Sequence, residues 1–129
     1  MAQGYYITKQ FGKADTTFQK LIELQPNISV GYLWTARTKS QLDPETVKGL
    51  AKPYYEKVIE KASANPEKEK NNLIEAYSYL GYYHYLKGDL QVSKGYWEKS
   101  LALNPADEKA KEAIRALNET MKGPPKPKN

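Results

Sequence analysis

The residues that could carry out catalysis or bind a metal are few and scattered. The chain has one histidine, His84, and no cysteine, which excludes thiolate nucleophiles, disulfides and Cys-ligated metal sites. A catalytic histidine needs a nucleophile or an acid that orients it, and the nearby Ser78 and Ser93 have the spacing of groove or packing residues. The glycines are isolated, so no glycine-rich phosphate loop is present. We therefore expect no catalytic residues, no cofactor, no metal and no enzymatic activity.

The abundant tyrosines indicate a different kind of function, which is non-covalent recognition of a partner. Eleven of the 129 residues are tyrosine, and five of them lie between Tyr77 and Tyr85. Tyrosine rings provide binding area at a low cost in conformational entropy. In a helix, Tyr82 and Tyr85 share the phase of Ser78, one step round from the phase of Tyr77. Two interpretations stay open: these rings form a binding surface, or they pack against a neighbouring part of the chain.

The net charge of +5 does not indicate a nucleic-acid partner. Three lysines, Lys122, Lys126 and Lys128, lie in the last eight residues, which contain no acid. Without them 17 basic residues face 15 acidic ones, an ordinary solvated surface. No apolar run approaches the roughly 20 residues that span a bilayer, and the N-terminus has no signal-peptide pattern. We expect a soluble chain with no nucleic acid and no membrane insertion, in a compartment that the sequence leaves open.

The most informative stretch for structure runs from residue 74 to residue 105. Apolar and small residues recur there at steps of three and four on both sides of Gly88-Asp89, which predicts two amphipathic helices. Gly88 can adopt the left-handed conformation that ends the first helix, and the Asp89 side chain can cap the second. At Gly81 and Ser93 small residues allow the two helices to cross closely. We expect the large Trp97 to fill the space between this hairpin and the next element.

This spacing resembles the tetratricopeptide repeat (TPR), whose pattern is W-x2-L-G-x2-Y, then A-x3-F and a proline. The chain departs from the pattern in residue type, with Tyr for Trp, His for Tyr, Ser for Ala and Trp for Phe, while the spacing is intact. The matching positions are Tyr77, Leu80, Gly81, His84, Ser93, Trp97 and Pro105. The resemblance implies an all-α, right-handed solenoid of antiparallel helix pairs. His84 then occupies a packing position.

Two further segments resemble parts of the same repeat. The partial repeat at 4–26 matches at Ala14, Phe18 and Pro26, and the repeat at 27–64 matches at Tyr32, Ala36, Ala51 and Tyr55. Asn27 or Ser29 can cap the first helix of the latter. A short turn at 44–48 should precede its second helix, which we expect to start near Gly49 because Pro53 then falls in the first turn.

Residues 1–121 are thus predicted to form one TPR-like domain, with a repeat at 66–105 and a capping helix at 106–121. The first helix of the repeat at 66–105 is expected to begin near Pro66. Residues 122–129 are expected to be a disordered tail. The nearly absent first helix before residue 14 suggests the C-terminal part of a longer array.

In TPR proteins one phase of each repeat's first helix lines a concave groove that binds peptides. Carried over by position, the groove residues here are Leu33, Arg37, Ser40, Ser78, Tyr82 and Tyr85. The TPR subset that clamps a C-terminal carboxylate uses Lys and Asn at such sites, so a chaperone-tail receptor is not expected. The resemblance implies a non-catalytic protein-interaction module, with Arg37 suited to an acidic group of an extended peptide. The alternative is a structural module that self-associates or contacts an upstream domain through Tyr5, Tyr6 and Phe11.

Overall fold

The chain folds into α-helices that follow one another in an ordered stack. A computed structural model describes residues 11–24 and 28–122, with side chains from Thr17 onward. Within these residues every regular element is an α-helix, which confirms the predicted all-α helical repeat fold. The helices are α2 (Phe11–Leu24), α3 (Ser29–Leu42), α4 (Lys52–Ala62), α5 (Lys70–Leu86), α6 (Leu90–Leu103) and α7 (Glu108–Lys122).

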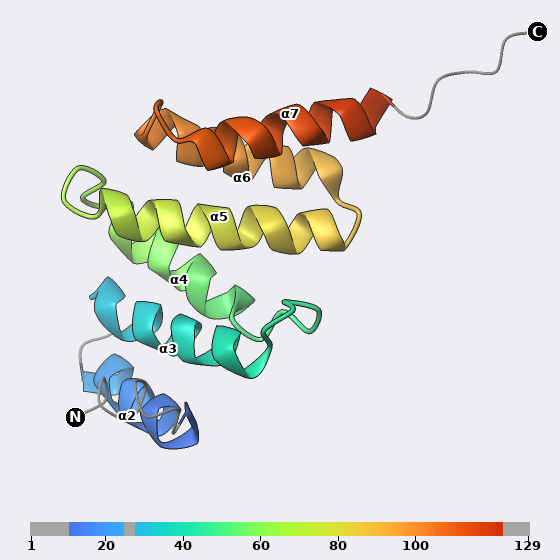
Figure 1. Ribbon diagram of the computed structural model, residues 1–129. Helices are drawn as coiled ribbons and strands as arrows, with labels where there is room; N and C mark the ends of the chain where they lie inside the picture. The colour runs from blue at the N-terminus through green and yellow to red at the C-terminus, as the bar shows by residue number, and fades with distance from the viewer. Residues whose placement is uncertain (1–10, 25–27, 123–129) are drawn as a thin grey trace, which may run out of the picture.

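Each helix packs against the next one in the chain, so the molecule is built of helical hairpins. Figure 1 shows α3, α5 and α7 running in the same direction on the viewer's side, with α4 and α6 behind them. Stacking buries the apolar faces that one hairpin alone would leave exposed. The side-by-side helices α5 and α7, with α6 behind them, build the site described below.

The turn between α5 and α6 depends on Gly88, whose φ of 82° lies in the left-handed region that suits glycine. The predicted side-chain cap of α6 is not formed, because the Asp89 carboxylate turns toward His84, with Oδ2 3.3 Å from Nδ1. The predicted cap of α3 is also wrong for Ser29, which lies inside the helix and donates its hydroxyl to Glu69. Asn27, the other candidate, lies outside the described residues.

The connection between α3 and α4 is longer than a simple turn and is organised by the buried Asp43. Its carboxylate accepts hydrogen bonds from the backbone N–H groups of Lys48 at 3.3 Å, Gly49 at 2.8 Å and Leu50 at 3.4 Å. Helix α4 then begins at Lys52, three residues after the expected start, and places Pro53 in the first turn where no N–H is needed.

Helix α5 begins at Lys70, so the expectation of a start near Pro66 is wrong. Residues 66–69 form turns instead, and Glu69 at the N-cap has the non-helical angles φ −106° and ψ 25°. The Glu69 carboxylate accepts from Ser29 of α3 and, at 3.3 Å, from Asn72. The Glu69 carbonyl accepts the N–H of Leu73 at 3.0 Å, as expected of the residue that precedes the helix.

In the part of the chain that the structure describes, buried side chains gather in two clusters. The first joins α3, α4 and α5 and consists of Leu33, Ala36, Ala51, Tyr55, Val58, Ala76 and Leu80. The second joins α6 and α7 and consists of Trp97, Ala110 and Leu117. Trp97 thus lies between the α5–α6 hairpin and the last helix, the place that the sequence indicates for it.

Small residues allow α5 and α6 to approach closely next to this tryptophan. A Cβ atom at Gly81 would lie 2.6 Å from Nε1 of Trp97, a distance that real Cβ contacts do not reach. The buried Ser93 hydroxyl donates a hydrogen bond of 2.6 Å to the carbonyl of Gly81. The Gly81 carbonyl thereby accepts a second hydrogen bond, and the buried Ser93 hydroxyl has a hydrogen-bond partner within the protein.

The other positions that carry the repeat pattern lie as follows. Phe18 is buried, Tyr32 is half-buried against the first cluster, Tyr77 and His84 are half-buried, and Pro105 is exposed. The side chain of Ala14 and all of Pro26 lie outside the described residues, as do the tail from residue 123 and the first ten residues.

Candidate functional site

Tyr82 and Tyr85 form one wall of a groove between α5 and α7. Their spacing from Ser78 by steps of four and three places all three on one face of α5. Tyr82 is 46% exposed and Tyr85 47% exposed, unusually open for rings next to a core. Both rings therefore present apolar area to solvent.

The opposite wall belongs to α7 and is made of small side chains. Ala113, Ala116 and Leu117 face the two tyrosines across a cavity of about 160 Å³, with the 5%-exposed Trp97 also in its lining. The space exists because alanine, with a single methyl group, stands where a larger residue would fill it. The result is an apolar pocket that opens on the surface.

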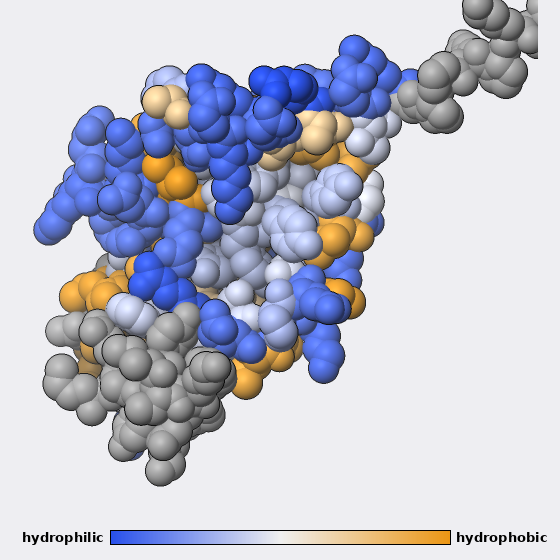
Figure 2. All heavy atoms as spheres, in the orientation of Figure 1, coloured by the Kyte–Doolittle hydropathy of each residue, from blue (hydrophilic) through white to orange (hydrophobic). Residues whose placement is uncertain are grey.

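A second hollow continues this pocket toward the start of α7. Its lining is Ser78, Tyr79, Tyr82, Trp97 and Lys109, so the two hollows share a tyrosine and the tryptophan. We call their joint surface the α5–α7 groove. The groove is lined by Ser78, Tyr79, Tyr82, Tyr85, Trp97, Lys109, Ala113, Ala116 and Leu117. In Figure 2 the corresponding face shows pale residues of intermediate hydropathy over α5, below the strongly hydrophilic outer surface of α7.

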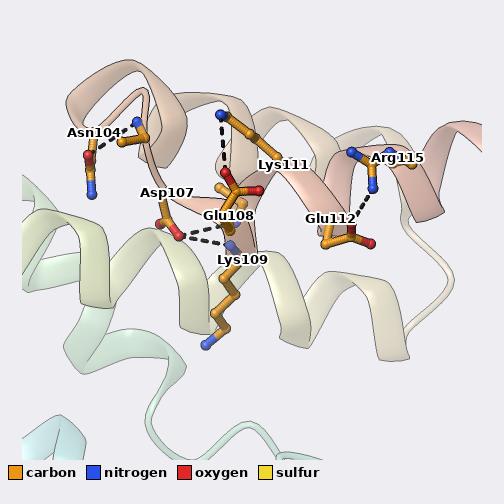
Figure 3. A network of polar contacts seen from close by, with 9 residues as sticks. Asn104, Asp107, Glu108, Lys109, Lys111, Glu112 and Arg115 are labelled. Carbon is orange, nitrogen blue, oxygen red and sulfur yellow. Dashed lines mark hydrogen bonds and ion pairs between the residues drawn. The ribbon is translucent and has the colours of Figure 1, made fainter.

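Lys109 is the charged side chain of this lining, and it differs from its basic neighbours on α7. Lys111 and Arg115 form ion pairs with Glu108 and Glu112 on the outer side of the helix. Figure 3 shows the side chain of Lys109 pointing away from these pairs. Among the described residues its ammonium group forms no ion pair and lies 5.9 Å from the centre of the Trp97 ring. A positive charge without a counter-ion is therefore available at one end of the groove.

The backbone around Lys109 is fixed by the residues that begin α7. The Asp107 carboxylate accepts the N–H of Lys109 at 3.0 Å and that of Ala110 at 3.4 Å, as a helix cap does (Figure 3). The amide oxygen of Asn104 accepts the N–H of Ala106 at 3.3 Å in the preceding turn. The lysine thus extends from an ordered helix terminus.

The structure separates the predicted groove residues into two groups. Ser78, Tyr82 and Tyr85 lie together in the α5–α7 groove. Leu33 is 4% exposed and belongs to the first core cluster, so it is not a groove residue. Its side chain packs against residues of α4 and α5, such as Val58 and Leu80, in that cluster.

Arg37 is also placed differently from the expectation, since its guanidinium group is engaged within the fold. Its Nε and Nη2 donate to the two carboxylate oxygens of Glu75 at 2.9 and 2.6 Å. The planar fork that was expected to meet a ligand carboxylate therefore holds a carboxylate of the chain itself. Ser40, one turn further along α3, is half-buried and does not line the groove.

The Arg37–Glu75 pair is part of a network that joins α3, α4 and α5. The hydroxyl group of Tyr55 donates to Glu75 at 2.8 Å, and the Tyr55 ring lies 4.6 Å from the ring of Tyr79. Burial, followed by the neighbouring Glu75 carboxylate, raises the pKa of Tyr55 well above its usual value. Burial, followed by the charge of Asp43, raises the pKa of Tyr79 to about 12. Both phenols therefore stay protonated at pH values where a free tyrosine ionises, and Tyr55 remains a hydrogen-bond donor to Glu75.

His84 lies outside the groove and has aromatic neighbours. Its ring stacks on Tyr96 at 5.6 Å and meets the edge of Tyr83 at 5.1 Å. Within the described ranges no cluster of three His, Cys, Asp or Glu side chains could hold a metal ion. In the same part of the chain, no helix has the length and apolar character that crossing a membrane requires.

The contribution of α7 to the groove was not predicted from the sequence. The expected role of this helix is that of a cap, and the predicted groove residues do not include Lys109, Ala113 or Ala116. A sequence feature that points to them exists, because these three residues are spaced four and three apart and share one face of the helix. The alternative of self-association depends on Tyr5, Tyr6 and the side chain of Phe11, which lie outside the described residues.

Comparison with known proteins agrees with this architecture. Residues 74–107 match the sequence model of the tetratricopeptide repeat. The crystal structure of the C-terminal part of a TPR repeat-containing protein from Cytophaga hutchinsonii is 45% identical, with a TM-score of 0.85 over 88% of this chain. This chain spans 44% of that one, less than half of its length. No curated protein matches the sequence.

Two more distant structures share the fold. The first TPR of Spaghetti (RPAP3), bound to an HSP90 peptide, is 16% identical with a TM-score of 0.73, covering 95% of this chain and 88% of its own. The first TPR domain of the human RPAP3 protein, solved by NMR, is also 16% identical, with a TM-score of 0.68 over 94% of this chain and 87% of its own. At this identity the likeness concerns the fold alone.

Proposed function

Because the chain belongs to the tetratricopeptide repeat family, we propose that it is a non-catalytic interaction module that binds a protein or an extended peptide in the α5–α7 groove. Repeats of this family are generally protein–protein interaction modules. The main support for this proposal is that the rings of Tyr82 and Tyr85 are half-exposed and lie beside an apolar pocket. Aromatic side chains next to a water-excluding pocket are typical of the residues that dominate binding energy.

The composition of the groove favours a macromolecular ligand over a reaction. Its lining combines aromatic rings, small aliphatic side chains, one serine and one lysine, and none of these is paired with a base or an acid that would activate it. The groove runs between two parallel helices, so it can hold an extended segment along its length. The pair Tyr82 and Tyr85 would contact such a segment from one side.

The proposal is tested by selecting ligands from a displayed library of random octapeptides. The chain should enrich binders, and Tyr82→Ala/Tyr85→Ala should bind these at least roughly tenfold more weakly, because the loss of an anchor typically costs over ~1 kcal/mol. Val92→Ala is the matched control, since Val92 is 47% exposed on α6 and points about 140° away from Trp97 around that helix. It should bind as the wild type does.

The free energy of unfolding provides a second measurement on the Tyr82→Ala/Tyr85→Ala variant. Because both rings are half-exposed, the double variant should unfold within about 1 kcal/mol of the wild type. Equal peptide binding by the wild type and the double variant would reject the groove as the binding site. A large loss of stability would place the two rings in the core instead.

A further inference from the structure

We propose that the α5–α7 groove selects a segment with an apolar anchor side chain and a carboxylate two or three residues away from it. This inference rests on the proposed function and names the chemistry of its ligand. The anchor enters the pocket between Tyr82, Tyr85, Ala113 and Ala116, and the carboxylate meets the ammonium group of Lys109.

The size and lining of the pocket define the anchor. A volume of about 160 Å³ resembles that of an engineered apolar cavity of about 150 Å³ that binds benzene. The pocket therefore accommodates a side chain such as leucine, methionine or phenylalanine. Its lining offers rings and methyl groups rather than hydrogen-bonding partners, so a buried polar anchor would lose its bonds to water without replacement.

The absence of a larger side chain on α7 makes this pocket possible. Ala116 is exposed, and Ala113 is half-buried and packs against the Trp97 cluster with its one methyl group. The buried contact of α7 with Trp97 is made by Ala110 and Leu117. Helix α7 is thus held mainly by its larger and fully buried residues, while the single methyl groups of Ala113 and Ala116 leave space beside the tyrosines.

The charge requirement comes from Lys109. Its ammonium group forms no ion pair with any described residue, while Lys111, Arg115 and Lys122 each pair with a glutamate of α7. One lysine with no arginine beside it in the lining suits a single carboxylate better than a phosphate, which proteins usually bind with several cations or an arginine fork. The partner group is therefore an aspartate or a glutamate.

The spacing follows from helix geometry. Lys109 precedes Ala113 by four residues and Ala116 by seven, so the centre of the pocket lies about 8 Å further along α7 at 1.5 Å per residue. An extended peptide advances about 3.3 Å per residue. The anchor and the acidic residue are then separated by two or three positions.

The test uses the displayed octapeptides and synthetic versions of one selected sequence. Selection should enrich leucine, methionine or phenylalanine at one position and aspartate or glutamate two or three positions away. Affinity is then measured by titration calorimetry for the selected peptide and for versions with the anchor changed to alanine or the acid to its amide. Each of these changes should weaken binding by roughly tenfold.

Two protein variants assign the contacts. Ala116→Leu fills the pocket and should weaken binding at least tenfold, whereas Ala102→Leu changes an exposed alanine of α6 outside the groove and should not. Lys109→Met should weaken binding of the acidic peptide but not of its amide form. Lys111→Met, which removes a lysine already paired with Glu108, should leave both affinities unchanged. Melting curves verify that all four variants are folded.

The outcomes separate this inference from the function it rests on. If Tyr82→Ala/Tyr85→Ala loses binding while Ala116→Leu and Lys109→Met keep it, the groove is the site and the ligand chemistry stated here is wrong. Enrichment without a common anchor and acid, or equal binding of a phosphoserine and an aspartate peptide, also overturns the inference. If none of the groove variants affects binding, the proposed function itself fails.

Discussion

A comparison of two glycine-to-alanine substitutions would measure how closely α5 and α6 approach each other. Gly81 and Gly95 both lie inside helices, at least five residues from either end. A Cβ atom at Gly81 would lie 2.6, 2.8 and 2.9 Å from three atoms of the Trp97 indole, whereas a Cβ atom at Gly95 would meet nothing within 4 Å. The two positions therefore differ in their surroundings and not in their secondary structure.

The expected magnitudes follow from two known effects. Replacing an interior helix glycine with alanine stabilises a helix by about 1 kcal/mol, and this gain applies at both positions. Overpacking a filled core costs about 1–3 kcal/mol, and this cost applies only at Gly81. Trp97 is 5% exposed and packs against Ala110 and Leu117, so a shift of the indole would disturb these contacts.

The difference between the two variants thus isolates the overpacking cost. Gly95→Ala should be more stable than the wild type by about 1 kcal/mol, and Gly81→Ala should be less stable than Gly95→Ala by about 1–3 kcal/mol. For a chain of this length, 1 kcal/mol corresponds to a shift in Tm of about 4 °C. Urea unfolding and thermal melts monitored by circular dichroism give both quantities. Equal stability of the two variants would refute the close crossing at Trp97.

Three further predictions address the network, the last helix and the association state. Because the Tyr55 pKa is raised in the fold while an unfolded tyrosine titrates near 10, the free energy of unfolding should fall as pH rises above about 10. This group contributes up to about 1.4 kcal/mol per pH unit, so Tyr55→Phe should show a shallower decline in urea unfolding curves at pH 9 to 11, and an identical decline would contradict the assignment. A chain cut after Pro105 should bind the dye ANS or associate, because α7 no longer covers Trp97; a well-behaved monomer without dye binding would show that α7 is dispensable. If the alternative of self-association holds, sedimentation should detect a dimer that Tyr6→Ala dissociates, whereas a monomer at all concentrations would exclude it.

The sequence predicts the hairpin at residues 74–105 well because its determinants are local. The helical period, Gly88 at the turn and the small residues at the crossing all lie within one short stretch. The family match covers residues 74–107, nearly the same stretch. Because the helical period and the glycine at the turn indicate the same boundaries, this hairpin can be predicted from the sequence alone.

The side-chain arrangement of the site was harder to predict because it depends on contacts between distant segments. Arg37 and Glu75 are 38 residues apart, and the period of each helix does not show that these two side chains meet. Asp89 was expected to cap α6 by its type and position, but a nearby His84 provides a competing partner. The part of the groove that belongs to α7 requires the packing of that helix against Trp97, which only the folded chain shows.

Mapping of backbone amide chemical shifts by NMR shows directly whether a peptide binds in the α5–α7 groove. A peptide selected on the wild-type chain is titrated into the isotope-labelled protein, and the shifts are assigned by residue. If the α5–α7 groove binds the peptide, the largest changes fall on α5 from Ser78 to Tyr85 and on α7 from Lys109 to Leu117. Changes confined to α4, to the far side of α6 around Val92 or to the connection at 43–51, with these two segments unaffected, would contradict binding in this groove.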